Sequence, residues 1–504
     1  MKKVLNWAII CIIFVLLIFV MLKSGSGDTT GVTKQTISEV GNKVTLDSLG
    51  EAVTQTKIGL NYVWMILCGC LIFFFQAGFA MVETGFTRAK NANHTMAMNL
   101  VVFLVGLVGF LTIGFAIMFG GVGDISALGG ATNLTSEATI GNWGIFGYKG
   151  FLLAGVAYDV GICVYFFFQA VFMDTACTIP TGSMAERVKL SAIIANTIFI
   201  STLYYPLFGN WVWGGGWLSQ LGVNVGLGHG VVDFAGSSVV HAMGGAAALA
   251  GAIIIGPRIG KFKKNGKSNV IPGHHIPMAV IGTIILFFGW FAFNAGSTLS
   301  GSDLRSGVVV VNTMIAGAVG GLVALAYMWK KFGKPDTSMT CNGALAGLVA
   351  ITAPCAFVNP IAAIIIGAVA GLLVCIAVQI FENKFKIDDP VGASSVHLVN
   401  GLWGMIALGL FADGSYGYGL NGVAGGVTGL FYGDGGQLVA QLIAVAVVIV
   451  FGIGSQLLFW KITDKTIGIR VKEEDEIEGL DIPEMGASAY PDFEYKIGIG
   501  SKNK

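Results

Sequence analysis

Apolar runs of about 20 residues recur along almost the whole chain and are separated by short polar loops. A helix of that length crosses the hydrocarbon core of a bilayer. The pattern therefore predicts an all-α polytopic membrane protein with eleven transmembrane helices after an amino-terminal apolar segment. The predicted spans are residues 60–83, 97–120, 150–178, 190–213, 233–256, 276–299, 307–329, 340–356, 358–380, 394–412 and 436–460.

Lysine and arginine gather in alternate loops of this pattern. They occupy the segments after the first, third, fifth, seventh, ninth and eleventh spans, whereas the opposite loops between spans hold only Lys149 and Arg305. Cytoplasmic loops of membrane proteins carry such an excess of basic residues. The sequence therefore predicts a multi-pass protein of the plasma (inner) membrane, with its mature amino terminus outside and its tail in the cytoplasm.

The start of the chain differs in its residue pattern from the membrane domain that follows. Residues 1–24 combine a basic start with a long apolar run, which is typical of a secretory signal. The run lacks a clear small-x-small cleavage site, so a cleaved signal peptide and an uncleaved anchor both fit it. We expect an extracytoplasmic segment at 25–58, the transmembrane domain at 59–461 and a cytoplasmic tail at 462–504.

Composition excludes several classes of protein. Only 11% of residues are charged, against about 25% in a soluble globular domain. Lysine and arginine number 29 and aspartate and glutamate 28, so no basic excess is present to bind nucleic acid. The chain contains no phosphate-binding GxxxxGK[ST] motif, no HExxH and no CxxC. We therefore predict no enzyme activity, no metal site, no cofactor and no nucleic-acid partner.

Two similar strings suggest an internal repeat. AGSSVVH at 235–241 opens the fifth predicted span, and GASSVH at 392–397 opens the tenth. Ten spans divide into two halves of five, and two such halves run in opposite directions, as in many transporters. The sequence thus predicts a 5+5 inverted repeat, with one further span.

Each of these strings ends in a histidine at membrane depth. His241 and His397 occupy equivalent places in the two predicted halves. A buried histidine can simply donate to a backbone carbonyl, and this structural role remains an alternative. Ionisable residues inside a membrane are costly, however, and usually functional. The repeat axis is expected to bring the two imidazoles together near the midplane, where they can share an N–H···N hydrogen bond.

Aromatic and polar residues flank the same region. Phe293 and Ser297 are four residues apart and therefore share one helix face, while Phe172 lies in the third span. An indole beside a hydroxyl can hold a small cation through its π face, although tryptophans at this depth also form interfacial belts. Asp233 starts the fifth span, where capping of the helix is the simpler role. The tryptophans at the outer end of the fourth span are Trp211, Trp213 and Trp217.

Longer strings identify a family that the chain resembles. The chain is similar to the Amt/Mep/Rh family of ammonium transporters, in its Amt branch, over residues 60–485. The matching strings are FFFQAGFAMVETGFTRAKN (73–91), FFQAVF with MAER (167–187), WVWGGGW (211–217), DFAGSSVVH (233–241), GWFAFNAGS (289–297), CNGALAGLVAIT (341–352), DDPVGASSVH (388–397) and IRVKEEDEIEGLD (469–481).

The resemblance implies roles for the outer residues. Trp213 and Ser297 would form the recruitment site for ammonium, with methylammonium as an analogue. Phe172 and Phe293 would be the stacked gate beneath this site. Asp233 would support both the outer site and the start of the fifth span.

The resemblance also implies the pore and its partners. His241 and His397 would be paired pore histidines, and conduction would run inward. The family fold assembles as a homotrimer with one pore per subunit. The acidic segment Glu473–Asp481 resembles the cytoplasmic region through which PII-type signal proteins block relatives.

Some alternatives and departures remain. An ammonium sensor that conducts little is the second hypothesis, and a membrane enzyme the third. Sequence leaves open whether the released proton follows the ammonia. Asp174 stands where relatives usually carry a small apolar residue, and we expect it to point away from the pore towards a subunit contact rather than to bias the pore's electrostatics. Pro180 is expected to kink the third span.

Overall fold

The computed structural model describes residues 46–123, 125–129 and 134–492. The predicted signal or anchor at 1–24 lies outside these residues. Residues 25–45 of the expected extracytoplasmic segment also lie outside them. The rest of that segment is helical, because α2 begins at Leu46, well before the predicted first span.

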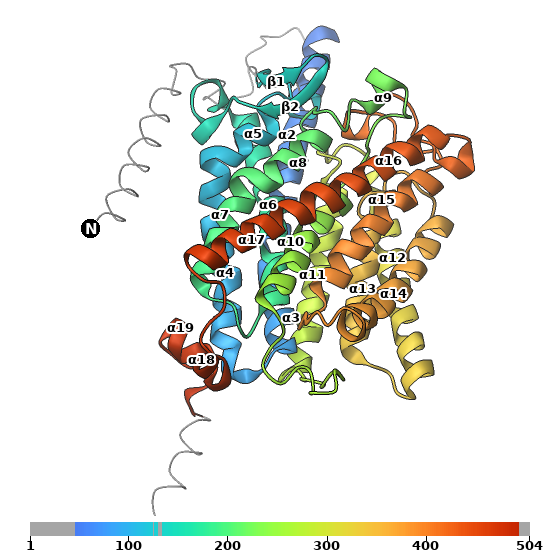
Figure 1. The fold of residues 1–504 in the computed structure, drawn as a ribbon. Helices are drawn as coiled ribbons and strands as arrows, with labels where there is room; N and C mark the ends of the chain where they lie inside the picture. The colour runs from blue at the N-terminus through green and yellow to red at the C-terminus, as the bar shows by residue number, and fades with distance from the viewer. Residues whose placement is uncertain (1–45, 124, 130–133, 493–504) are drawn as a thin grey trace, which may run out of the picture.

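The described part of the chain is a bundle of helices with one small hairpin (Figure 1). The helices are α2 (Leu46–Phe73), α3 (Phe75–Phe86), α4 (Ala92–Gly109), α5 (Phe115–Phe119), α6 (Val160–Met184), α7 (Leu190–Phe199), α8 (Tyr205–Trp213), α9 (Leu221–Val225), α10 (Met243–Ile255), α11 (Ile276–Gly296), α12 (Ser306–Phe332), α13 (Thr337–Ile351), α14 (Pro360–Asn383), α15 (Asn400–Phe411), α16 (Gly435–Val447), α17 (Gly454–Thr466), α18 (Glu473–Glu478) and α19 (Asp481–Met485). Five-to-six-residue π-helical segments join several of them, at Phe110–Gly114, Ile200–Tyr204, Ser237–Ala242, Ser394–Val399 and Val448–Ile453.

Ten helical stretches of the described chain are long and apolar enough to cross a membrane. They are α2 with α3, α4 with α5, α6, α7 with α8, α10, α11, α12, α14, α15, and α16 with α17, together with the turns joined to them. The remaining predicted span, 340–356, falls on the shorter apolar helix α13. The chain is therefore a predominantly helical, multi-pass membrane protein.

The predicted third span begins too early. The structure starts α6 at Val160, ten residues later than predicted, and residues 151–157 form short 3₁₀ turns instead. Asp159 explains the difference, because its carboxylate accepts from the backbone N–H of Gly161 (2.9 Å) and Ile162 (3.2 Å) and so caps the helix. The helix then passes through Pro180 without ending.

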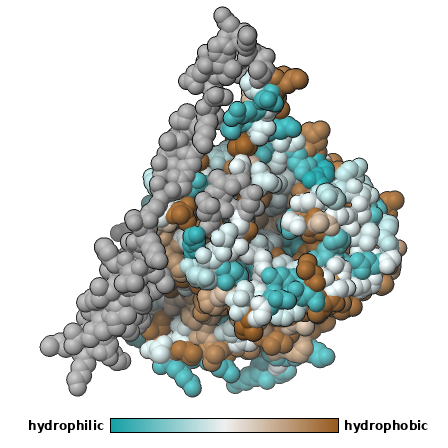
Figure 2. All heavy atoms as spheres, turned by 90° about the horizontal axis from the view of Figure 1, so that it is seen from above, coloured by the Kyte–Doolittle hydropathy of each residue, from teal (hydrophilic) through white to brown (hydrophobic). Residues whose placement is uncertain are grey.

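The two ends of the bundle differ. The antiparallel strands β1 (Glu137–Ile140) and β2 (Trp143–Gly147) lie at one end with α9, and α18 and α19 lie at the other (Figure 1). We call these the hairpin end and the tail end. The sequence predicted an all-α fold, and the hairpin corrects this to a predominantly helical one. Seen from the hairpin end, hydrophobic residues gather mostly towards the rim (Figure 2).

The tail returns to pack on its own chain. Lys90 Nζ donates to the carbonyl of Glu476 (2.6 Å), and the backbone N–H of Leu480 donates to Asn91 Oδ1 (2.9 Å). The N–H of Leu190 donates to Glu484 (2.9 Å). These contacts fix α18 and α19 against the loops that precede α4 and α7.

Candidate functional site

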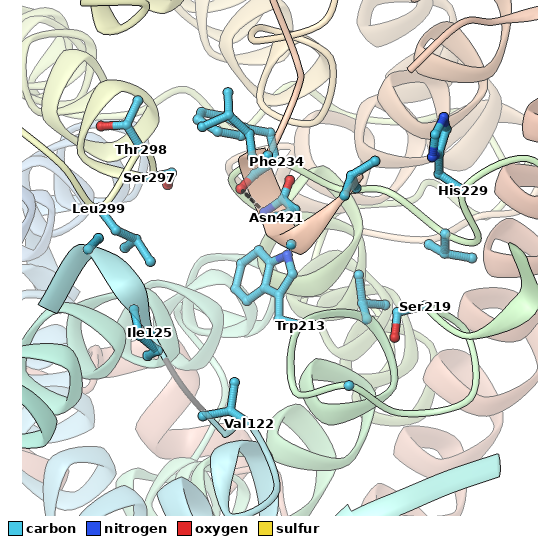
Figure 3. A pocket seen from close by; sticks show the side chains of 18 of the residues that line it. Val122, Ile125, Trp213, Ser219, His229, Phe234, Ser297, Thr298, Leu299 and Asn421 are labelled. Carbon is cyan, nitrogen blue, oxygen red and sulfur yellow. Dashed lines mark hydrogen bonds between the residues drawn. The ribbon is translucent and has the colours of Figure 1, made fainter. Parts of the chain in front are cut away.

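A cavity of about 720 Å³ opens from the hairpin end. Figure 3 shows Trp213 projecting into it, with Ser297 and Thr298 on one side and His229 on the other. Phe172 lies in its floor. The cavity, which we call the vestibule, therefore contains the predicted outer residues Trp213 and Ser297 above the first ring of the predicted gate.

Hydrogen bonds fix what the vestibule residues can offer a ligand. Trp213 Nε1 donates to the backbone carbonyl of Asp233 (2.6 Å), so the indole N–H is already used and its π face remains. Ser297 Oγ donates to the carbonyl of Phe293 (2.9 Å), so its oxygen lone pairs remain. A π face and a hydroxyl oxygen both attract a small cation that donates hydrogen bonds.

Stacked aromatic rings close the vestibule floor. The centroids of Phe172 and Phe293 lie 4.1 Å apart with an interplanar angle of 28°, and Trp213 meets Phe172 edge-on at 6.2 Å. Phe75 from α3 stacks on the other side of Phe293 at 5.3 Å. Phe172 and Phe293 are at most 1% exposed, so the two rings are closely packed at the base of the vestibule. Sequence reasoning assigned no role to Phe75.

The two histidines lie directly behind these rings. His241 Nδ1 and His397 Nδ1 are 3.2 Å apart, and both side chains are buried. Phe293 contacts His241 at 5.6 Å between centroids, Trp290 stacks on His241 at 4.9 Å, and Phe79 contacts His397 at 5.8 Å. The gate and the imidazole pair thus form one continuous aromatic column.

The Nδ1–Nδ1 contact has a chemical consequence. In a neutral pair one Nδ1 donates and the other accepts, so one ring carries its proton on Nε2 and the other leaves Nε2 bare. Which ring takes which role depends on the tautomer. His241 Nε2 has no hydrogen-bond partner within the described residues. The pair therefore presents one proton donor and one proton acceptor in an apolar surrounding.

The same local design positions both histidines. Each lies eight residues after an aspartate, in the pattern D-x2-G-x-S-x2-H, which starts at Asp233 and again at Asp389. The glycine of each pattern has a positive φ, 113° at Gly236 and 78° at Gly392, which an L side chain rarely adopts. Both histidines lie in π-helical segments, which often occur at functional sites.

Asp233 uses its whole carboxylate to hold the first of these segments. It accepts five hydrogen bonds, from the backbone N–H of Gly236, Ser237, Ser238 and Val239 and from the Ser238 hydroxyl, at 2.7–3.1 Å. Its carboxylate is buried, while its carbonyl positions Trp213. Asp389 repeats the arrangement by accepting from Gly392, Ala393 and Ser394. Capping and support of the vestibule are thus combined in Asp233.

Two glycines let the histidine segments meet. Gly245 and Gly401 each follow a histidine by four residues. A Cβ on Gly245 would lie 2.2 Å from the backbone nitrogen of Leu398, and one on Gly401 would lie 2.4 Å from the carbonyl oxygen of Ser237. Because neither glycine has a side chain, each lets the backbone of the segment that carries the other histidine approach closely. Small residues have the same effect where membrane helices cross.

We expect Gly245→Ala to lower the midpoint of thermal unfolding by several degrees. The added methyl meets backbone that cannot move aside cheaply, and overpacking of this kind costs about 1–3 kcal/mol. Gly307→Ala in α12 is the matched control, because nothing lies within 4 Å of its Cβ position. Equal midpoints for the two variants in detergent would contradict the tight crossing.

Asp174 does not lie where the sequence predicted. Its side chain is only 2% exposed in a single chain, so the predicted orientation towards a subunit contact is wrong. It follows Phe172 by two residues, which on a helix places it about 200° away from the gate ring. Asp174 Oδ1 has no hydrogen-bond partner in the described chain. This carboxyl is therefore buried inside the bundle, away from the gate.

Metal-binding side chains do not cluster in the described ranges. No group of three or more histidine, cysteine, aspartate or glutamate side chains there could hold a metal ion. The cysteines of those ranges are free thiols.

Comparison with known proteins agrees with this geometry. The model of the Ammonium Transporter Family matches residues 63–490. The ammonium transporter Amt2 of Archaeoglobus fulgidus is 48% identical over 442 residues, covering 87% of this chain and 89% of the relative. The ammonium transporter Amt1 of Haloferax mediterranei is 36% identical and covers 86% of this chain and 80% of the relative.

Solved structures share the fold. A protein titled Sensor Amt Protein has a TM-score of 0.74 at 36% identity, covering 86% of this chain and 99% of that chain. Mep2 of Candida albicans has a TM-score of 0.70 at 27% identity, covering 86% of this chain and 90% of that chain. The Archaeoglobus and Haloferax relatives are named ammonium transporters and the matching family is a transporter family rather than an enzyme family, which confirms the resemblance found in the sequence. The chain belongs to the Ammonium Transporter Family.

Proposed function

We propose that this chain takes up ammonium at the hairpin end, removes one proton and conducts ammonia inward past His241 and His397. Membership of the family supports ammonium transport. The order of the steps is our inference from the vestibule, the aromatic gate and the imidazole pair. The observation that carries it is the 3.2 Å contact between the two histidines at the end of the aromatic column.

Recruitment rests on Trp213 and Ser297. The free indole face attracts a cation, and the lone pairs of Ser297 accept a hydrogen bond from ammonium. Potassium has a similar size but donates no hydrogen bond. The vestibule therefore favours ammonium by its chemistry rather than by its width.

Loss of the proton lowers the free-energy cost of moving the substrate through an apolar interior. A bare cation transferred to an apolar interior costs on the order of tens of kcal/mol, whereas neutral ammonia avoids most of this cost. Phe172 and Phe293 support this order of steps, because their stacked rings are at most 1% exposed and leave no space for a hydrated cation to pass between them. Beyond them, the imidazole pair offers one donor and one acceptor to ammonia without a fixed charge.

The charge pattern and the tail support the location and the partners that we propose. Basic loops favour a plasma-membrane protein whose tail end faces the cytoplasm and whose amino terminus lies outside. Large apolar side chains on the bundle surface suit lipid and the neighbouring subunits of a homotrimer. The acidic residues of α18 at the tail end would meet a PII-type regulator.

A sensor is the second candidate, supported by the structural likeness to the Sensor Amt Protein. Both candidates require an ammonium site, so binding alone does not separate them. A sensor that conducts little gives binding without sustained flux.

The test is transport by the purified full chain in proteoliposomes. We expect uptake of methylammonium, together with a response to an ammonium pulse but none to potassium in solid-supported-membrane electrophysiology, which also reports whether charge moves. Trp213→Leu should raise the half-saturating concentration about tenfold, the scale of a lost cation–π contact. Trp217→Leu, which does not line the vestibule, should not. Binding without flux would favour the sensor.

A further inference from the structure

One face of α3 follows the aromatic column towards the tail end. Phe75 stacks on the gate ring Phe293, and Phe79, four residues later, contacts His397. Residues four apart on a helix share a face. Glu83 comes four residues after Phe79 and therefore lies one helical turn beyond the histidine pair, on the side that the column occupies.

Glu83 is enclosed among polar side chains. It is 2% exposed, and Asn99 Nδ2 donates to its Oε2 at 3.0 Å. Thr181 Oγ1 lies 2.8 Å from its Oε1 and 2.9 Å from its Oε2. A Cβ on Gly182 would lie 2.5 Å from Val391 and 3.1 Å from Glu83 Cδ. The carboxyl group is thus wedged between the end of α6 and the segment that leads to His397.

No cation neutralises Glu83 in the part of the chain that the structure describes. The nearby arginines pair elsewhere, since Arg88 and Arg258 bind Glu186, and Arg258 also binds Asp388. Burial alone raises the pKa of Asp388, but the hydrogen bonds and charge of Arg258 outweigh it and hold that pKa below its usual range. Glu83 has no such partner within the described residues, and the carboxyl group of Asp389 disfavours a second negative charge at Glu83.

The hydrogen bonds around Thr181 are compatible with a protonated carboxyl group on Glu83. The single hydroxyl proton of Thr181 faces three oxygens, the two of Glu83 and the carbonyl of Thr178 at 2.5 Å. If Thr181 donates to Thr178, Glu83 can donate its own O–H to Thr181 Oγ1. Every group is then satisfied with Glu83 as a carboxylic acid.

We propose that Glu83 is the proton donor that converts ammonia to ammonium below the histidine pair. The carboxyl O–H bond breaks as the lone pair of ammonia forms a fourth N–H bond, which gives ammonium and a Glu83 carboxylate. A proton from water at the tail end then restores the acid. The proposal rests on the proposed inward transport and assigns its last chemical step.

The test uses purified full-length protein in proteoliposomes, with the internal pH varied and the external pH fixed. Methylammonium uptake by the wild type should fall as internal pH rises, because the acid form of Glu83 is lost. Glu83→Gln keeps the size of the side chain but carries no transferable proton. We expect its maximal rate to fall about tenfold or more, with an unchanged half-saturating concentration and no dependence on internal pH.

A matched variant and a rescue separate chemistry from structure. Asp174→Asn neutralises another buried carboxyl outside the column and should keep the wild-type rate and pH profile. Imidazole buffer inside the vesicles should accelerate Glu83→Gln but not the wild type, because it supplies the missing proton. If Glu83→Gln does not fold, Glu83→Asp should shift the midpoint of the internal-pH profile.

Three outcomes overturn the assignment. They are a Glu83→Gln variant with the wild-type rate and pH profile, a slow variant that internal imidazole does not accelerate, and a Glu83→Asp variant with an unshifted midpoint. With any of these three outcomes, the proposed function stands as long as the wild type still takes up methylammonium. Absence of flux in the wild type itself would instead count against the proposed function.

Discussion

Replacing His241 with alanine should reduce methylammonium uptake by about 100-fold or more, the scale on which a positioned acid–base group acts. The substitution removes the partner of His397 Nδ1 and breaks the aromatic column beside Phe293 and Trp290. His397 is then left with an unpaired polar atom in apolar surroundings, which is costly. Uptake into proteoliposomes, with potassium flux measured in parallel, checks the expectation.

The matched control is His275→Asn. His275 caps the start of α11, and its Nδ1 accepts from the N–H of Met278 at 3.0 Å, a capping bond that asparagine can also make. This variant should transport at the wild-type rate. If His241→Ala kept both the rate and the discrimination against potassium, His241 would have no part in conduction.

Asp233→Ala should prevent accumulation of folded protein. The change removes all five hydrogen bonds to the carboxylate and leaves four buried backbone N–H groups unpaired. Each unpaired buried group costs about 1–3 kcal/mol, and the net stability of a domain is only about 5–15 kcal/mol. Size-exclusion chromatography and thermal unfolding in detergent measure the loss.

Asp434→Ala provides the comparison, because Asp434 is an ordinary cap. Its carboxylate accepts one bond at the start of α16, from the N–H of Gln437 at 3.0 Å. Loss of such a cap costs about 1 kcal/mol, so this variant should fold with a slightly lower midpoint. Similar effects of the two substitutions would mean that Asp233 is only a cap of the usual strength.

Helix positions could be read from the sequence wherever an apolar run ended in charge. Most predicted spans fall on apolar helices for this reason. The start of α6 was missed because the apolar residues before Asp159 resemble a continued span, although Asp159 itself is a capping signal. The hairpin was also missed, although Gly141 and Asn142 between β1 and β2 form a typical two-residue turn.

The site was predictable only in part. The repeated strings pointed to His241 and His397, and the structure brings these rings together. Phe75, Phe79 and Glu83 were not assigned, because α3 is apolar almost all round and its periodicity does not show which face meets the aromatic column. That face is fixed by packing against α11, α4 and α6, which a single sequence does not reveal.

The wide turns that carry His241 and His397 restrict how the length of the chain can vary. A π turn accommodates one residue more than an α turn, so the segment between Asp233 and His241 already holds its extra residue. A second residue inserted there would have no turn left to absorb it, and would rotate the imidazole by about 100° about the helix axis, away from its partner. The number of residues between the anchoring carboxylate and the ring is thus restricted at both Asp233 and Asp389, more strictly than the identity of most residues between them.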